Sequence, residues 1–329
     1  MNILFSTVGR RGYIVNYFKQ NLNNETDCII GTSDRNNCDS EFTSAFHYCD
    51  KTYIVPSIKN ESEYIQELLQ ICNKEKIDII LSFYDLDSFV ISKYINKFKD
   101  IGVVPIISSF EVNEIAFDKI KTYNFLKENG FMTPKTWSSV DALNYTAMQF
   151  PVIVKPRFGF GSNYIHIANN KEEMEFFINY NKNDELIVQE FLNGQEYSFD
   201  ILNDLNSKTI VSVVKKKLKM RSGETDQGYA IENEDLLTEA YRLGKSLNHI
   251  GPLDVDFFLI NEKPYILELN PRFGGGYPIS YIAGANFPKL IIDMVKNNLN
   301  TDYSIYQNYK TNKVMIKDIN ILEADCTYE

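Results

Sequence analysis

Apolar and polar residues alternate with a period of two in the stretch from Asp254 to Gly276, which reads DVDFFLINEKPYILELNPRFGGG. The segments DVDFFLI and YILELN predict two strands of a hairpin, joined by the turn residues NEKP. This alternation places Asp254 and Asp256 on one face of the first strand, and Glu268 and Asn270 on one face of the second. If these faces coincide, Asp256, Glu268 and Asn270 offer oxygen atoms to one point, as Mg²⁺ prefers. The alternative interpretation is an acidic, solvated hairpin edge.

Short apolar runs alternate with amphipathic segments at the start of the chain. We predict strands at residues 2–8, 28–32, 53–55, 77–82 and 103–107, and helices at 13–22, at 62–74 with Ser62 as cap, and after residue 82. This order is typical of βαβ units. The sequence therefore predicts a small, doubly wound, Rossmann-like domain over residues 1–112.

The later part of the chain mixes helices with hairpin-like strands, which is typical of an α+β fold. We predict helices at 117–131, 172–180, 234–247 and 287–297, and strands at 150–155, 164–168, 185–191, 196–202, 209–218 and within 313–322. The segment PRFGFGS lies between the strands at 150–155 and 164–168. It differs from a P-loop, which needs a GxxxxGK[ST] run followed by a helix.

Composition narrows the function classes. The chain has 329 residues, of which 44% are hydrophobic and 24% charged, with a net charge of -10. This acidity argues against general nucleic-acid or anionic-membrane binding, which needs a basic surface. The five cysteines have no CxxC spacing, so we expect free thiols in a reducing cytoplasm and no zinc site. The N-terminal apolar run is too short for a signal peptide, and no apolar segment is long enough to span a bilayer.

Three polar segments remain open to two interpretations each. Arg10 and Arg11 follow the first strand, where they either hold an anionic ligand beside a helix or are solvated. Asp85 and Asp87 follow the strand at 77–82 and either touch a substrate or cap the next helix, with capping preferred. The run KKKLKMR ends at Arg221. We interpret its lysines as belonging to a solvated edge strand, and we prefer a substrate contact as the role of Arg221.

In combination, these motifs resemble the ATP-grasp superfamily, and more narrowly its stand-alone members similar to the carbamoyl phosphate synthase large subunit. The motifs are Asp118-Lys119, VIVKPRFGFGS, VQEFLNGQEYSFD and the hairpin ending in ELNPR. The resemblance covers nearly the whole chain. It implies a pre-ATP-grasp domain at 1–112, a small ATP-grasp lobe at 113–186, and a large lobe with the C-terminal tail at 187–329.

The resemblance also implies roles for individual residues. It implies that ATP is bound by Lys119, Lys155, Gly159, Gly161, Ser162, Glu190, Phe191, Leu192 and Glu196. It implies that one or two Mg²⁺ ions are held by Asp256, Glu268 and Asn270, where Asp256 replaces the Glu or Gln common in near relatives. Arg272, with Lys155 and Asn270, would stabilise the reacting phosphoryl and acyl groups. Arg10, Arg11, Asp85, Arg221 and Gly275 are expected on the substrate side.

The activity implied is the ADP-forming ligation of a small carboxylate to an amine through an acyl phosphate. The acid could be an amino acid, a peptide precursor or a sugar acid. Two alternatives stay open: a carbamoyl-phosphate-type or other phosphorylating enzyme, and a non-catalytic ATP-binding sensor. Dimerisation is an expectation that comes from the family alone.

Overall fold

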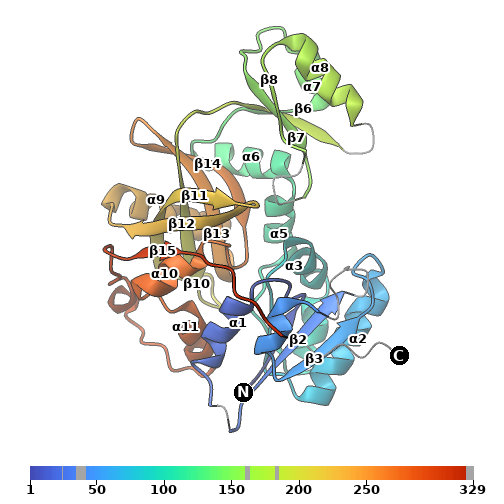
Figure 1. Cartoon of the computed structure of the whole chain (residues 1–329), viewed down its shortest axis with the longest axis vertical. Coiled ribbons are helices and arrows are strands. Elements are labelled where there is room, and N and C mark those ends of the chain that lie inside the picture. Colours follow the sequence, from blue (N-terminus) through green and yellow to red (C-terminus); the bar gives the residue numbers. More distant parts are fainter. Residues whose placement is uncertain (24, 35–41, 160–163, 182–184, 324–329) are drawn as a thin grey trace.

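The computed structural model of the 329-residue chain describes all residues except 24, 35–41, 160–163, 182–184 and 324–329. Figure 1 shows the N-terminal domain in blue, a small lobe in green, and a large sheet in yellow and orange. Helix α6 (Lys119–Glu128) lies between the small lobe and the rest of the chain. Within the described residues, no helix is both long enough and apolar enough to cross a membrane.

The N-terminal domain is a parallel sheet with strand order β3-β2-β1-β4-β5. Its strands are β1 (Asn2–Ser6), β2 (Cys28–Asp34), β3 (Lys51–Val55), β4 (Ile79–Ser82) and the two-residue β5 (Val104–Pro105). The helical elements between them are α1 (Gly12–Lys19), the short 3-10 helix η1 (Ser44–Tyr48), α2 (Glu61–Glu75), α3 (Asp85–Ser92) and α4 (Ile95–Asp100). The predicted doubly wound fold is therefore confirmed.

Both faces of this parallel sheet are buried. Ile3 and Phe5 belong to one apolar cluster, whereas the intervening Leu4 belongs to another. The first cluster continues into the large lobe, where the Phe18 and Phe273 rings make an edge-on contact at 5.9 Å. A strand buried on both sides needs an uninterrupted apolar run, which explains why these strands were visible in the sequence.

Two local expectations in this half of the chain were wrong. Helix α2 begins at Glu61 after Asn60, so Ser62 lies inside it and does not cap it. The helix expected over 117–131 is shorter, because it begins only at Lys119 as α6, and a separate helix that was not expected, α5 (Phe110–Phe117), precedes it with a break at Asp118. Asp118 has extended backbone and its carboxylate accepts from the N–H of Ile120. The division thus fixes Lys119 in the first turn of α6.

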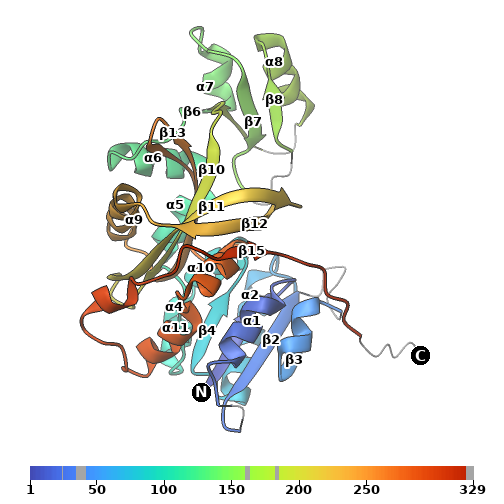
Figure 2. The same ribbon diagram turned by 60° about the vertical axis from the view of Figure 1, so that its left-hand side comes forward.

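The small lobe is a four-stranded antiparallel sheet with order β6-β9-β7-β8. It contains β6 (Thr136–Ser138), β7 (Val152–Pro156), β8 (His166–Ala168) and β9 (Leu186–Glu190), with α7 (Ser139–Asn144) and α8 (Lys171–Tyr180). Figure 2 shows both helices on one side of this sheet. The other side carries Lys155 at the end of β7.

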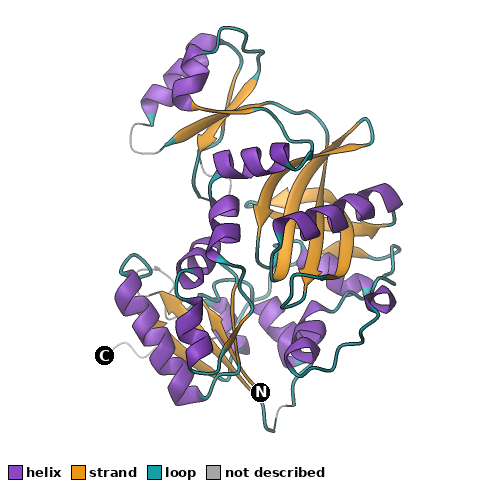
Figure 3. Cartoon of the chain, turned by 180° about the vertical axis from the view of Figure 1, so that it is seen from behind, coloured by secondary structure: helices purple, strands orange, loops and turns teal. Residues whose placement is uncertain are grey.

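The large lobe is a six-stranded antiparallel sheet with order β14-β13-β10-β11-β12-β15. Its strands are β10 (Gln195–Asn203), β11 (Thr209–Arg221), β12 (Glu224–Ile231), β13 (Gly251–Ile260), β14 (Lys263–Asn270) and β15 (Val314–Ile316). Helix α9 (Glu234–Leu247) lies across one face, as Figure 3 shows. Helices α10 (Tyr277–Ala283) and α11 (Phe287–Val295) and the 3-10 helix η2 (Tyr303–Tyr306) follow the hairpin. The sequence reasoning missed β12 and α10 and made β15 too long.

Period-two alternation separates the two faces of this sheet. Phe199, Val255 and Phe257 pack in the apolar cluster with Leu243 of α9. The residues between them in sequence, including Asp200, Asp254 and Asp256, therefore point to the opposite face. Strand β11 lies inside the sheet, paired with both β10 and β12. The interpretation of its lysines as a solvated edge is wrong, because Lys215 is 0% exposed and Lys217 is 6% exposed.

A buried histidine makes the fold sensitive to acid. His249 is fully buried and its Nδ1 lies 3.1 Å from Nδ2 of Asn203. Burial lowers the pKa of its imidazole from 6.5 to about 3. Below pH 6.5 the unfolded chain binds a proton that the folded chain does not, so stability falls as the pH drops. We expect a loss of about 2 kcal/mol at pH 5 from this group alone.

The measurement is urea unfolding between pH 5 and 7.5. His249→Gln is expected to flatten the pH dependence of the unfolding free energy, whereas the exposed His47→Gln should leave it unchanged. An equal slope in His249→Gln and the unsubstituted chain would contradict the assignment.

Candidate active site

The carboxylates of the hairpin face one another. Asp256 lies opposite Glu268, and Asp254 lies opposite Asn270, in the register of β13 with β14. The prediction that these faces coincide is confirmed. A bulge in the ladder follows Asp256. Oxygen atoms from two strands are therefore presented together on the face that α9 does not cover.

Two lysines approach Glu268 from the other side of the cleft. The Nζ of Lys155, a residue with 7% exposure, lies 3.6 Å from Oε1 of Glu268. The Nζ of Lys119 donates to the carbonyl of Gly159 at 2.8 Å. Burial lowers the pKa of the Lys119 ammonium. The negative charge of Glu268 raises this pKa, and the positive charge of Lys155 lowers it further. Burial would raise the pKa of the Glu268 carboxyl, but Lys155 and Lys119 together lower it, so this group is ionised at neutral pH.

A further ion pair holds this arrangement in place. Arg157 follows β7 and donates from Nε and Nη2 to the two carboxylate oxygens of Asp118, at 2.8 and 2.6 Å. This bidentate contact joins the loop after β7 to the first turn of α6. Lys119 and Lys155 are thereby brought to the same side of the cleft, although 36 positions separate them in the sequence.

A cavity of about 260 Å³ lies between the small lobe and the large sheet. Its lining includes five of the nine residues expected to bind ATP, namely Lys155, Glu190, Phe191, Leu192 and Glu196, and two of the three expected metal ligands, Asp256 and Glu268. Apolar side chains on its other walls are Ile153, Ile165, Phe258 and Leu267. Lys119, Gly159 and Asn270 line an adjoining small hollow that also contains Glu268. Gly161 and Ser162 lie outside the described residues.

Lys217 is a member of this site that sequence reasoning missed. Its Nζ lies 2.6 Å from Oε1 of Glu196 and 2.7 Å from Oδ1 of Asp256. Burial raises the pKa of the Asp256 carboxyl to about 6, against the lowering effect of Lys217. The two carboxylates raise the pKa of Lys217 in spite of its burial, so this residue is a cation at neutral pH. The signal for it was the spacing of Lys215 and Lys217, which puts both on one face of a strand.

Lys215 forms a second buried centre on the same face. Its Nζ lies 2.7 Å from Oδ1 of Asp200 and 3.1 Å from Oδ1 of Asp254. Asp200 also accepts a hydrogen bond of 2.5 Å from the hydroxyl of Ser280 in α10. A buried ammonium with two carboxylate partners meets the requirement that buried charges be paired.

Arg272 links this face of the large sheet to the N-terminal domain. Its Nη2 donates to Oδ2 of Asp85 and to Oδ1 of Asn270, both at 3.1 Å, and its Nη1 lies 3.5 Å from Oδ2 of Asp254. The preferred capping role of Asp85 and Asp87 is wrong, since no side chain caps α3. Asp87 is instead fully buried and accepts from the hydroxyls of Ser6 and Tyr64. Asp85 turns toward the large lobe because Arg272 supplies a buried countercharge.

The other residues expected on the substrate side fall into two places. Arg11 donates to the carbonyls of Phe83 and Phe273, at 3.0 and 2.5 Å, so it joins the two domains. Arg10 and Arg11 both line a cavity of about 720 Å³ at the carboxyl ends of the parallel strands. Arg221 is half-exposed, and its Nε lies 3.2 Å from Asp226.

Gly275 lies close to Arg272, in a part of the site that also contains Glu224. A Cβ at Gly275 would lie 2.9 Å from Cδ of Glu224, so only glycine fits there without movement. Glu224 in turn contacts Nε of Arg11 at 3.5 Å and Nζ of Lys317 at 2.9 Å. The nearby hydroxyl of Tyr13 is buried and has no hydrogen-bond partner among the described residues. An unpaired buried hydroxyl is costly, so this region is suited to receive a polar ligand.

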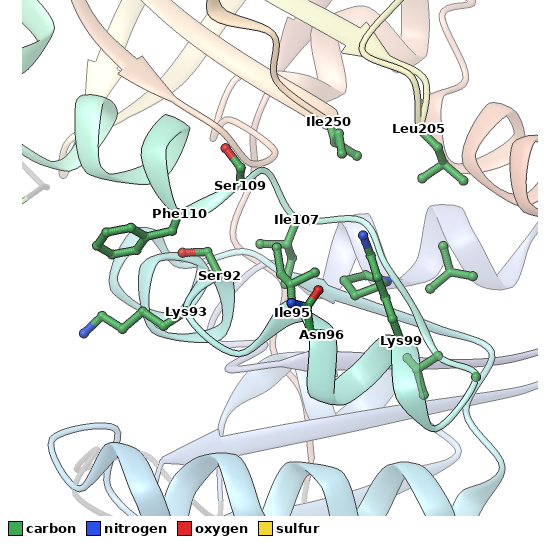
Figure 4. Close-up of a pocket in the computed structure, with 14 residues that line it drawn as sticks. Ser92, Lys93, Ile95, Asn96, Lys99, Ile107, Ser109, Phe110, Leu205 and Ile250 are labelled. Carbon is green, nitrogen blue, oxygen red and sulfur yellow. The ribbon is translucent and has the colours of Figure 1, made fainter.

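A further hollow, of about 550 Å³, is separate from these sites and is shown in Figure 4. It lies between α4 and the segment after β5 on one side, and Leu205 and Ile250 of the large lobe on the other. Its lining is mainly apolar and includes none of the residues expected to take part in chemistry.

Comparison with known proteins decides the family. Residues 3–107 match the PylC-like N-terminal domain family, and residues 116–276 match the ATP-grasp domain family. The chain contains an ATP-grasp domain. The resemblance predicted from the motifs is therefore confirmed. The ATP-grasp match begins just before Lys119 and ends at Gly276, so it spans both lysines, the cavity and the hairpin.

Curated relatives of this ATP-grasp chain include the carbamoyl phosphate synthase large chains of Clostridium perfringens and Clostridium beijerinckii. They are 23% and 24% identical to it over 267 residues, which is 76% of this chain and 24% of each relative. The chain thus spans about a quarter of the length of these relatives.

Solved structures share the fold over most of the chain. The L-amino acid ligase of Bacillus licheniformis has a TM-score of 0.72 at 17% identity, covering 95% of this chain and 78% of that one. The biotin carboxylase of Campylobacter jejuni has a TM-score of 0.73 at 14% identity, covering 95% and 74%. N5-Carboxyaminoimidazole synthetase of Staphylococcus aureus, complexed with ADP, has a TM-score of 0.71 at 17% identity, covering 92% and 78%.

The donor set of the ATP-grasp hairpin suits Mg²⁺ at Glu268 and Asn270. The Glu268 carboxylate is ionised and 36% of its side chain is exposed to the cleft. Asn270 Oδ1 accepts from Arg272, yet a carbonyl oxygen keeps a second lone pair. In the described ranges, no group of three or more His, Cys, Asp or Glu residues is arranged to hold a metal by itself. An ion here would therefore depend on nucleotide phosphates and water for its other ligands, as Mg²⁺ commonly does.

Proposed function

We propose that this ATP-grasp chain is an ADP-forming carboxylate–amine ligase that works through an acyl phosphate. The observation that carries the proposal is the single cavity in which Lys155, the segment Glu190–Leu192, Glu196 and Glu268 meet. A nucleotide site alone would not need carboxylates at its phosphate end. Their presence beside two lysines supports phosphoryl transfer.

The cavity suits ATP in one orientation. The backbone of Glu190 to Leu192 would read the adenine between the apolar walls, and Glu196 would accept hydrogen bonds from the ribose hydroxyls. Lys155 and Lys119 would then meet the phosphates at the opposite end, beside Glu268. Lysine is suited to this task because its ammonium is a compact charge on a flexible stem. Bound Mg²⁺ would supply charge neutralisation on the phosphate oxygens, held by Glu268 and Asn270.

The proposed reaction has two steps. An oxygen of the acid attacks the γ-phosphorus of ATP, and the bond to the ADP oxygen breaks. The amine nitrogen then attacks the acyl carbon, and phosphate leaves with the oxygen that it gained, while the nitrogen loses a proton. Arg272 lies on the hairpin face at the end where the nucleotide phosphates would bind. It would stabilise the negative charge on the acyl phosphate and on the tetrahedral species that follows. No covalent intermediate with the enzyme is needed.

The second substrate would lie on the side of Arg272 that faces the N-terminal domain. Arg11, Glu224 and Lys317 bring charges of both signs to this region. The hydroxyl of Tyr13, which has no hydrogen-bond partner within the described part of the chain, lies among them. Such a mixed site suits a zwitterionic or amino-bearing substrate. Arg10 lines the larger cavity of about 720 Å³ and would contact the second substrate from that side.

Formation of carbamoyl phosphate, or of another small phosphorylated product, is the second candidate. It is favoured by the curated relatives, which are carbamoyl phosphate synthase large chains. The chain corresponds to about a quarter of the length of such a protein. It would therefore carry out only the phosphorylating step of this activity.

A phosphate-release screen tests the proposal. Purified chain is incubated with Mg²⁺ and ATP, and with a matrix of carboxylates, bicarbonate and amines. We expect ADP and phosphate to form only when both an acid and an amine are present. Release with bicarbonate as the acid would support the second candidate. ATP binding without release under any pair would contradict both enzymatic functions and support a sensor.

A further inference from the structure

The position of Lys217 bears on how many metal ions the site holds. Sheet order places β10 between β11 and β13. Lys217 therefore reaches from β11 past Glu196 of β10 to Asp256 of β13, with its ammonium 2.6 and 2.7 Å from the two carboxylates. Its side chain is only 6% exposed, so water screens these contacts little. This is a built ion triad and not a surface lysine that happens to lie near an acid.

Asp256 and Glu268 differ in what already neutralises them. One oxygen of Asp256 is bound by Lys217, and this carboxylate lies on the Glu196 side of the hairpin face. Among the described residues, Glu268 has a longer ion pair, of 3.6 Å to Lys155, and Lys119 also lies near enough to lower its pKa. The Glu268 side chain is the more exposed of the two, at 36% against 25%. A divalent ion at Asp256 would have to approach a fixed ammonium, which repels it. The same ion at Glu268 meets a carboxylate whose ion pair is longer, at 3.6 Å against 2.7 Å.

We propose that Lys217 supplies at Asp256 the positive charge that a second Mg²⁺ would otherwise supply, so that the chain binds a single Mg²⁺ with its nucleotide. That ion is held through Glu268, and Asp256 is an anchor for Lys217. Through Lys217, Asp256 also positions Glu196, the carboxylate assigned to the ribose. Lys217 is thus a positioning residue. This inference rests on the proposed nucleotide site, and it changes the assignment of Asp256 from a metal ligand to a partner of Lys217.

The test counts bound metal and does not depend on turnover. Mn²⁺ replaces Mg²⁺, and electron paramagnetic resonance measures the Mn²⁺ bound to protein in the presence of a saturating non-hydrolysable ATP analogue. We expect one Mn²⁺ for each unsubstituted chain. Glu268→Gln should weaken its binding by about 10-fold or more, whereas Asp256→Asn should change it by less than about 3-fold.

Removing Lys217 should create the second site. Lys217→Gln is expected to bind two Mn²⁺, and the double variant Lys217→Gln with Asp256→Asn should return to one. Lys219→Gln is the matched control, since Lys219 lies two positions further along β11 and is exposed. Lys217→Arg, which keeps the charge, should still bind one Mn²⁺. A thermal melt of each variant establishes that it is folded.

Three outcomes would overturn the inference. These are two Mn²⁺ in the unsubstituted chain, equal losses of affinity in Asp256→Asn and Glu268→Gln, or a folded Lys217→Gln that still binds only one. If Lys217→Gln does not fold, the comparison of Asp256→Asn with Glu268→Gln decides by itself. Absence of any analogue binding to the unsubstituted chain would overturn the proposed function as well, which separates the two failures.

Discussion

Glu268→Gln is expected to lower the kcat of ATP-dependent phosphate release by about 100-fold or more, since an amide cannot replace a carboxylate that holds Mg²⁺ at the reacting phosphates. The change removes a charge but keeps the shape of the side chain. The protein contact at stake is the 3.6 Å approach of Lys155, and 36% of the side chain is exposed. The variant should therefore fold normally, and steady-state kinetics over a range of Mg²⁺ concentrations measure its effect.

The matched control for this prediction is Glu262→Gln. Glu262 lies in the turn of the same hairpin, is exposed, and borders no described cavity. Its replacement should leave kcat within about 2-fold, because a solvated surface charge contributes little. Unchanged turnover in Glu268→Gln at low Mg²⁺ would show that Glu268 holds no metal and would remove the basis of the proposed site.

Arg272→Lys is expected to lower kcat by about 100- to 1,000-fold with little change in the KM for ATP. Lysine keeps the positive charge but not the planar fork of donors that can stabilise two oxygens at once. The milder substitution is preferred to alanine, because loss of the guanidinium would leave the largely buried Asp85 without its countercharge, at a cost of about 3–5 kcal/mol. Initial rates at saturating ATP, with the acid and amine identified by the screen, measure the effect.

Asp85→Asn separates catalysis by Arg272 from its role in joining the domains. This change weakens the contact between α3 and Arg272, in which the Nη2–Oδ2 distance is 3.1 Å, and keeps the guanidinium. It should lower the melting temperature and reduce kcat much less than Arg272→Lys does. If Arg272→Lys raised only the KM for ATP and left kcat intact, Arg272 would be a nucleotide contact and not a stabiliser of the reacting acyl group.

Local patterns in the sequence were sufficient where one element contains all the information. The alternation in the hairpin correctly placed Asp254, Asp256, Glu268 and Asn270 on one shared face, because side-chain direction along a strand depends only on position. The buried parallel strands were equally visible as apolar runs. By contrast, the division between α5 and α6 was missed, since it depends on Asp118 bonding to Arg157, which lies 39 positions away.

The roles of the lysines on β11 could not be read locally. A run of three lysines within KKKLKMR is typical of a solvated strand. Lys215 and Lys217 are nevertheless buried, because Asp200 and Glu196 on one neighbouring strand, and Asp254 and Asp256 one strand further, provide opposite charges. Whether a charged side chain can be buried is decided by its partners, and partners brought together by a sheet are distant in the sequence.

The sequence by itself determined the doubly wound and α+β fold classes, the family, and which residue types lie on the chemical face of the hairpin. These properties follow from short-range periodicity and from motifs in order along the chain. Only the tertiary structure decided which charges meet: Arg272 with Asp85, 187 positions away, and Lys217 with both Glu196 and Asp256. An ion pair depends on the distance between two side chains in space, and that distance is set by the packing of domains and strands.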